Sequence, residues 1–278
     1  MKEITGNTRI LGILADPIHH VKTPQLLNRL LFDHQIDGVM VPIHVPPARL
    51  SVAFEGLRNM SNLNGLVITV PHKTAVMALC DQVTEAAASI GAVNVVRRER
   101  DGAMVGDMLD GEGFVEGLQA LDYRLKGKRV YLAGAGGAAN AIAFALAKSG
   151  ISHLTVANRT SSRVDDLLSR LKRCYPDLDT RHGSADPSDH ELVINATSLG
   201  LREADALPVD TTKLHAGQMV ADIIMEPAET ALLKAARIQG CTAYPGAGML
   251  AGQVRRMMEF LCAGEPSVLA KSPTAATL

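Results

Sequence analysis

The residues that most directly suggest chemistry are Gly134, Gly136 and Ala139, which follow the apolar run 130–133. In a G-x-G-x-x-A turn, the first glycine can adopt a positive φ and the second lets the backbone approach a ligand closely. The alanine allows tight packing between helix and strand, and the N–H groups that begin the helix attract a pyrophosphate. The same residues also fit a glycine-rich turn in an ordinary α/β unit, so the motif needs support from the rest of the chain.

A second candidate group, Asn158-Arg159-Thr160 with Arg163 one turn later, follows the next expected strand. Enzymes that use NAD usually carry Asp or Glu at this point, hydrogen-bonded to the ribose. Two guanidinium groups and a hydroxyl suit a phosphate instead. An arginine on a solvated loop would leave the use of NAD open, but the pattern favours NADP over NAD.

Strands and helices that alternate along the chain must position these residues. Such an alternation predicts an α/β fold with mostly parallel sheets, in which ligands bind beyond the carboxyl ends of the strands. We expect strands at 9–15, 39–45, 65–70, 92–97, 130–133, 154–157, 192–195 and 219–224. Helices are expected from the N-cap Thr23 onward, at 46–58, after Lys73, from the glycine turn to about 149, and at 162–175, 230–239 and 250–262.

Composition excludes several classes of partner. The formal net charge is −1, with acidic and basic residues mixed along the chain, so neither nucleic acid nor a membrane surface is an expected partner. The apolar run 10–15 is too short for a signal peptide, and no segment has the length of a membrane span. The four cysteines form no C-x-x-C pair, which predicts no zinc site and no disulfide framework but reduced thiols in the cytoplasm.

Five stretches, taken in order, resemble the shikimate dehydrogenase family. They are Asp16-Pro-Ile-His-His-Val-Lys-Thr-Pro24, Thr69-Val-Pro-His-Lys73, Gly91-Ala-Val-Asn94, Gly106-Asp-Met-Leu-Asp110, and Gly134 to Ala139 followed by Asn158-Arg-Thr160. Asn195-Ala-Thr-Ser-Leu-Gly200 and Gly248-Met-Leu-Ala-Gly-Gln253 add to the match, so the resemblance spans nearly the whole chain.

The resemblance implies two α/β domains with the substrate in the cleft between them. The N-terminal substrate-binding domain would comprise residues 1–108 with a C-terminal helix at about 247–264. A Rossmann-type, doubly wound dinucleotide-binding domain would occupy 109–246, and 265–278 would be a poorly ordered tail.

The resemblance also implies residue roles. Lys73 and Asp110 match the family's catalytic pair, and oxidation of a secondary alcohol needs such a group to take the hydroxyl proton as hydride leaves. The implied substrate-binding positions are Val21, Thr23, Thr69, Asn94 and Gln253. The implied cofactor-binding positions are Gly134, Ala135, Gly136, Gly137, Ala138, Asn158, Arg159, Thr160, Arg163, Thr197, Ser198, Gly246 and Met249, and no metal is expected.

Departures from the family pattern concern the substrate. Val21 and Thr23 stand where the family usually has two serines that hold the substrate carboxylate, and Val67 stands where asparagine is common. A site that loses a hydrogen-bonding partner loses discrimination, which places high affinity for shikimate in question. His19, His20 and His72 are candidate compensating donors near the carboxylate site, or else solvated or structural residues.

Three functions follow as alternatives. The first is an NAD(P)-dependent oxidoreductase that acts on shikimate or quinate, as a monomer or homodimer. The second is the same chemistry on another alicyclic acid. The third is a cofactor-binding sensor with little turnover, against which the presence of both Lys73 and Asp110 argues.

Overall fold

The computed structural model describes residues 3–19 and 21–263, which form two compact units. Of the described residues, one unit contains those up to Ala88, Ala92–Met108 and residues 254–263, and the other contains Ser89–Gly91 and Leu109–Gln253. The poorly ordered tail expected at 265–278 and the candidate donor His20 lie outside the described residues. Within the described ranges, no helix combines the length and apolar character that crossing a membrane requires.

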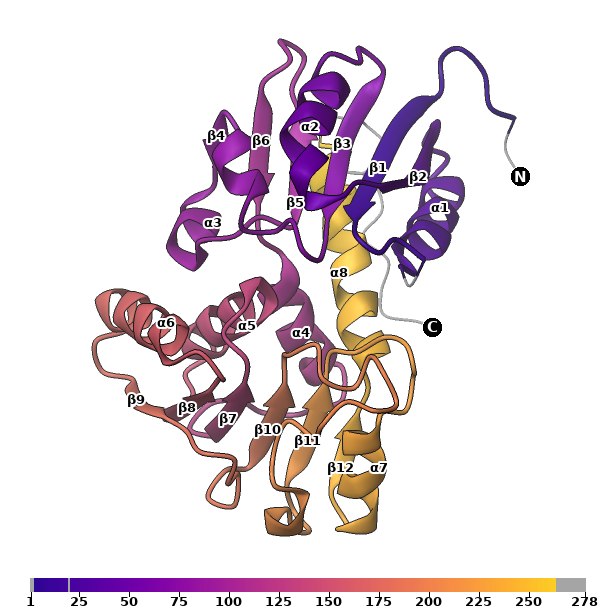
Figure 1. Cartoon of the computed structure of the whole chain (residues 1–278). Coiled ribbons are helices and arrows are strands. Elements are labelled where there is room, and N and C mark those ends of the chain that lie inside the picture. Colours follow the sequence, from indigo (N-terminus) through magenta and orange to yellow (C-terminus); the bar gives the residue numbers. More distant parts are fainter. Residues whose placement is uncertain (1–2, 20, 264–278) are drawn as a thin grey trace. The chain divides into compact units, whose positions relative to one another are not determined.

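The first unit is built on a six-stranded mixed sheet of order β2-β1-β3-β5-β6-β4 (Figure 1). The strands β2, β1 and β3 are parallel, whereas β5 runs antiparallel to both β3 and β6. Their bounds are β1 Arg9–Ala15, β2 Gly38–His44, β3 Leu63–Ile68, β4 Gln82–Val83, β5 Val95–Arg98 and β6 Met104–Asp107. Because β1 and β3 are parallel, the loops that follow them leave the same edge of the sheet.

The helices of the first unit begin and end close to the expected positions, with two differences. Helix α1 (Thr23–Asp33) begins at Thr23 itself with Lys22 as its N-cap, so the expected capping role of Thr23 is wrong. Residues 47–58 form the turn η1 (Pro47–Arg49) and helix α2 (Leu50–Arg58). The helix expected after Lys73 is only the turn η2 (Val76–Leu79), followed by β4 and helix α3 (Glu85–Ile90).

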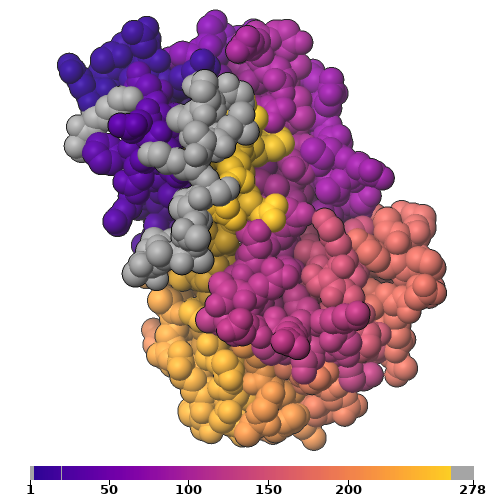
Figure 2. Space-filling view, turned by 180° about the vertical axis from the view of Figure 1, so that it is seen from behind, coloured from indigo at the N-terminus to yellow at the C-terminus, as the bar shows by residue number. Residues whose placement is uncertain are grey.

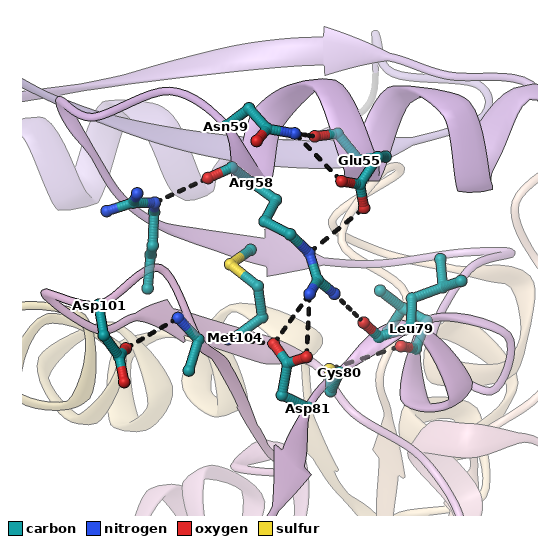
Figure 3. A network of polar contacts seen from close by, with 11 residues as sticks. Glu55, Arg58, Asn59, Leu79, Cys80, Asp81, Asp101 and Met104 are labelled. Carbon is teal, nitrogen blue, oxygen red and sulfur yellow. Dashed lines mark hydrogen bonds and ion pairs between the residues drawn. The ribbon is translucent and has the colours of Figure 1, made fainter.

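The reason for the early stop of η2 is a polar network at Asp81 (Figure 3). The Asp81 carboxylate accepts hydrogen bonds from the Arg58 guanidinium at 2.9 and 3.1 Å and from the Met104 backbone N–H at 2.7 Å. Arg58 also donates to the Leu79 carbonyl at 2.7 Å. These bonds hold the chain at the position from which β4 pairs with β6, which a continued helix would prevent.

The second unit has a fully parallel six-stranded sheet of order β12-β11-β10-β7-β8-β9. In chain order this is the arrangement of the Rossmann fold, with the first strand, β7, at the centre (Figure 1). The bounds are β7 Arg129–Ala133, β8 His153–Ala157, β9 Asp179–His182, β10 Leu192–Asn195, β11 Met219–Asp222 and β12 Thr242–Tyr244. The strands β9 and β12 were not expected, because short edge strands with polar residues carry little hydrophobic signal.

The helices of the second unit are α4 (Asp110–Gln119), α5 (Gly137–Lys148), α6 (Ser161–Cys174), α7 (Ala231–Ile238) and α8 (Gly246–Leu261), with the turn η3 (Thr211–Lys213). Helix α5 is apolar almost all round and correspondingly buried. It ends as expected, with Gly150 in the left-handed region at φ 77°.

Helix α8 is shared by the two units, because the division falls between Gln253 and Val254. The assignment of the helix at about 247–264 to the N-terminal domain stays a prediction, while the part of the helix before Val254 packs within the second unit. The physical cause is close packing inside the second unit. A Cβ added at Gly252 would lie 2.5 Å from the carbonyl oxygen of Gly113 in α4. Figure 2 shows the magenta and the orange-to-yellow segments of this unit exposed on one face.

Candidate functional site

The loop after β7 passes directly against the loop after β10, at the point where the strand order of the sheet reverses. Gly134 has φ 116°, and a Cβ there would lie 2.7 Å from the carbonyl oxygen of Ala196. Only glycine fits both the conformation and the space. Ala135, next to it, is 7% exposed. In a doubly wound sheet this reversal point forms the crevice in which ligands bind.

The backbone of the next loop residues is accessible to solvent. Gly136 is the N-cap of α5 with φ −90° and ψ −175°, and a Cβ added to it would meet nothing within 4 Å. Gly137 and Ala138 are partly exposed, and the first turn of α5 contains no acidic residue. Ala139 is fully buried where the helix packs on the sheet. The helix N-terminus and the open space over Gly136 therefore fit a diphosphate.

Two cations follow the neighbouring strand β8. Arg159 and Arg163 are exposed, as is Thr160, the N-cap of α6. The nearby acidic side chains are engaged elsewhere, since Asp165 pairs with His182 and Asp166 with Arg170. Asn158 donates to the Thr160 carbonyl at 3.1 Å, which shapes the loop. This arrangement leaves the guanidinium groups at the carboxyl end of β8 suited to a phosphate monoester.

A buried polar network holds the loops after β10 and β11. Asn195 donates to the Asp222 carboxylate at 3.0 Å and to the Leu199 carbonyl at 2.9 Å. Its Oδ1 accepts from the Thr197 hydroxyl at 2.7 Å and from the Thr197 backbone N–H at 3.1 Å. Thr197 is thereby fixed beside the Gly134 turn, while Ser198 is exposed.

Asp222 completes this network and was not among the expected site residues. It is 1% exposed and also accepts from the Thr230 hydroxyl at 2.7 Å and the Ile224 N–H at 3.0 Å. Burial raises the pKa of its carboxyl group, although the three hydrogen-bond donors oppose that shift. The sequence signal was present, since both Asn195 and Asp222 are polar residues that directly end apolar strands.

Asp110 and Gln253 meet inside the second unit. The Gln253 Nε2 donates to Asp110 Oδ1 at 2.8 Å, and the two residues are 5% and 2% exposed. Asp110 is the first residue of α4, and Gln253 lies in the middle of α8. Glycines bring the helices this close, because a Cβ at Gly113 would lie 2.2 Å from the Cγ of Gln253. The pair is thus a product of helix packing that sequence spacing does not reveal.

The start of α8 is fixed by a similar close approach. A Cβ at Gly246 would lie 2.5 Å from the Ile224 carbonyl oxygen, after β11. Met249, one turn later, is 5% exposed. Gly246 is therefore held next to the loop that the Asp222 network fixes, and Met249 follows it on the same helix.

In the first unit, Lys73, Thr69 and Asn94 lie at one edge of the sheet. The backbone N–H of Thr69 donates to Leu14 at the end of β1, at 3.0 Å. The Asn94 carbonyl accepts from Ile68 at 2.7 Å, and the Lys73 carbonyl accepts from Val93 at 2.8 Å. The turn with Lys73 is consequently tied to the segment with Asn94, which is 1% exposed.

The segment before α1 leaves the same edge of this sheet, after β1. Val21 is half-buried and Thr23 is 7% exposed, and the Val21 N–H closes a turn with the Ile18 carbonyl at 3.3 Å. His72 is 1% exposed, and its Nε2 bonds the Val45 carbonyl at 2.7 Å. This contact assigns His72 a structural role, so the alternative of a substrate donor is wrong.

Comparisons with known proteins agree with this architecture. The family model described as "Shikimate dehydrogenase substrate binding domain" matches residues 13–96, and that described as "Shikimate / quinate 5-dehydrogenase" matches 117–201. The shikimate dehydrogenase (NADP(+)) of Rubrobacter xylanophilus is 38% identical over 256 residues, which cover 89% of this chain and 88% of the relative.

Solved structures show the same fold. Shikimate 5-dehydrogenase of Thermus thermophilus, in complex with NADP(H) and shikimate, has a TM-score of 0.82 at 29% identity, covering 91% of this chain and 93% of that one. The ligand-free 5-ketofructose reductase of a Gluconobacter species has a TM-score of 0.79 at 32% identity, covering 91% and 92%. With two matching family models and this identity over most of its length, the chain belongs to the shikimate dehydrogenase family.

Proposed function

We propose that this chain is an NADP-dependent dehydrogenase that transfers a hydride between the nicotinamide and a ring hydroxyl or ketone of shikimate, quinate or a related alicyclic acid. The observation that carries this is the Gly134–Ala139 turn at the reversal point of a Rossmann sheet, with Arg159 and Arg163 after the adjacent strand. The similarity to curated NADP-dependent shikimate dehydrogenases supports the same reaction.

The cofactor would be held by the second unit. The Gly136–Ala138 backbone receives the diphosphate, and Arg159, Arg163 and Thr160 receive the 2′-phosphate. Thr197, Ser198, Gly246 and Met249 would complete the cofactor site. The bound nicotinamide supplies the hydride acceptor or donor, and the protein supplies orientation and proton transfer.

Lys73 and Asp110 are proposed as the proton-handling pair. In the oxidation direction, the Nζ of Lys73 would take the hydroxyl proton as the alcohol is oxidised. Asp110 is the second member of the proposed pair, and the Gln253 amide keeps its carboxylate in one orientation. In the reduction direction the same proton returns to the substrate oxygen.

The substrate contacts proposed are Thr23, Thr69, Asn94 and Gln253, with Val21 as the altered position. Val21 offers an apolar surface where a hydroxyl would bind a carboxylate. The similar Gluconobacter protein is a reductase of 5-ketofructose, a substrate that carries no carboxylate. The substrate panel should therefore include this ketose beside the alicyclic acids.

We also propose that the enzyme is cytoplasmic and works as a monomer or homodimer. Support for the location is that Cys80, Cys174 and Cys241 form no disulfide. Light scattering of the purified chain tests the oligomeric state.

The direct experiment follows nicotinamide absorbance with shikimate, quinate, an amino-substituted analogue and 5-ketofructose, each with NADP and NAD. We expect turnover with at least one alicyclic acid and a lower KM for NADP than for NAD. Lys73→Ala should reduce kcat by about 10²–10⁴-fold, whereas Lys234→Ala, an exposed lysine of α7, should not change it. Tight NADP binding without turnover of any substrate would instead indicate a sensor.

A further inference from the structure

A basic hollow lies in the first unit at the edge of the sheet opposite to the Lys73 turn. Arg9 begins β1 and Leu63 begins β3, while Arg98 ends the antiparallel strand β5, so these ends meet at one edge. The hollow has a volume of about 180 Å³ and is lined by Arg9, Ser61, Leu63, Asn64, Arg98, Glu99 and Arg100. None of these residues belongs to the site described above.

The described residues that line this hollow carry more positive than negative charge. Among them, Arg9, Arg98 and Arg100 are basic and Glu99 is acidic. The Glu99 carboxylate is already bound by Arg97, whose Nε and Nη2 donate to it at 2.9 and 2.5 Å. Arg97 is itself held over the Phe260 ring, 4.8 Å from its centroid. The negative charge of Glu99 is therefore offset by a fourth arginine outside the hollow.

The guanidinium of Arg98 is held in place by neutral acceptors. Its Nε donates to the Arg58 carbonyl at 2.8 Å and its Nη1 to the Glu99 carbonyl at 3.3 Å. Carbonyl groups orient a guanidinium without cancelling its charge. The acidic residues near the Arg58 end of this network, Glu55 and Asp81, bind the Arg58 side chain instead (Figure 3).

A second fixed group is Asn64. Its Oδ1 accepts from Arg9 Nη1 at 2.9 Å, and its Nδ2 donates to the Leu261 carbonyl of α8 at 3.0 Å. Arg9 is thereby aligned on the side of the hollow that faces Asn64. Guanidinium groups with fixed orientation match the oxygens of a phosphate with two parallel hydrogen bonds.

We propose that this hollow is a binding site for a phosphate group, as free phosphate or as the phosphoryl end of a small phosphorylated metabolite. None of its lining residues belongs to the proposed cofactor site, so the two sites are separate.

The test is calorimetric titration of the full chain with inorganic phosphate and with glycerol phosphate, at an ionic strength kept constant with chloride. Saturating NADP fills the phosphate subsites of the second unit beforehand. Arg100→Gln, at an exposed position, and Arg98→Gln should each weaken phosphate binding by about tenfold or more, since each removes a charge-assisted contact. Arg29→Gln, an exposed arginine of α1, is the matched control and should leave binding unchanged.

Tighter binding of glycerol phosphate than of inorganic phosphate would identify a phosphorylated metabolite as the ligand, and equal or weaker binding would identify free phosphate. Equal affinities of the wild type, Arg98→Gln and Arg100→Gln, or no phosphate binding above that of chloride, would overturn the proposal.

Discussion

Replacing Gly113 by alanine should disable the Asp110–Gln253 pair without removing either side chain. A Cβ at residue 113 would lie 2.2 Å from Gln253 Cγ, 3.0 Å from its backbone nitrogen and 3.1 Å from its Cα. The Cγ atom can move by rotation, but the backbone atoms can move only if α8 shifts. The expected result is a Gln253 side chain that no longer reaches Asp110 Oδ1.

The substitution should change stability only slightly and activity more strongly. Overpacking at a helix contact costs about 1–3 kcal/mol, and the higher helix propensity of alanine offsets about 1 kcal/mol of that, so the protein should stay folded. A hydrogen bond to a charged acceptor contributes about 1.5–3 kcal/mol. If this hydrogen bond stabilises the transition state, its loss lowers kcat/KM by roughly 10–150-fold.

The assay compares Gly113→Ala with Gln253→Ala and Gly56→Ala in steady-state kinetics and thermal unfolding. Gly56 is a helical glycine of α2 whose added Cβ would meet nothing within 4 Å. Gly56→Ala should therefore raise the free energy of unfolding by about 0.5–1 kcal/mol and leave kcat/KM unchanged. Gly113→Ala should match Gln253→Ala in activity. A Gly113→Ala enzyme with kcat/KM close to that of the wild type would refute the role given to the pair.

Three further predictions concern the substrate, the cofactor and the buried network. Val21→Ser should raise kcat/KM for shikimate relative to 5-ketofructose by about tenfold, because a hydroxyl again faces the carboxylate; an unchanged ratio would show that Val21 does not contact this group. Arg159→Gln should raise the KM for NADP by on the order of tenfold and leave that for NAD unchanged, and equal changes would separate Arg159 from the 2′-phosphate. Burial raises the pKa of Asp222 in the folded state, so the folded chain keeps this proton to a higher pH than the unfolded chain. The associated stability is full below the unfolded pKa of about 3.9 and is lost as pH rises through the raised folded value. The free energy of unfolding, measured with denaturant, should therefore fall over this pH range in the wild type relative to Asp222→Asn, which has no titrating group at this position. Parallel pH profiles of the two proteins would contradict this.

The cofactor side of the molecule was largely predictable because its signals are local. The turn at Gly134 needs a positive φ and lies between an apolar strand and an alanine-rich helix, and both features are visible in ten consecutive residues. The end of α5 at Gly150 follows from the same kind of signal. A local backbone requirement, such as a positive φ, restricts the residue type at that position, and the sequence shows it directly.

Features that depend on contacts distant in the chain could not be predicted in this way. The Gln253–Asp110 hydrogen bond joins residues 143 positions apart, and it exists because Gly113 and Gly252 let two helices approach. His72 has the same residue type as a substrate donor, and only its contact with Val45 shows that it is structural. The edge strands β9 and β12 are stabilised by pairing with β8 and β11 and not by their own composition.

The central claim is hydride transfer from the nicotinamide to a substrate carbon, and isotope transfer tests it most directly. The enzyme is mixed with NADPH deuterated at the transferring C4 position and with the ring ketone of the preferred substrate, and the product is analysed by mass spectrometry and NMR. The account predicts one deuterium on the carbinol carbon of the product, formed by the wild type and at least about 100-fold more slowly by Lys73→Ala. A product without deuterium, or a Lys73→Ala enzyme as fast as the wild type, would contradict it.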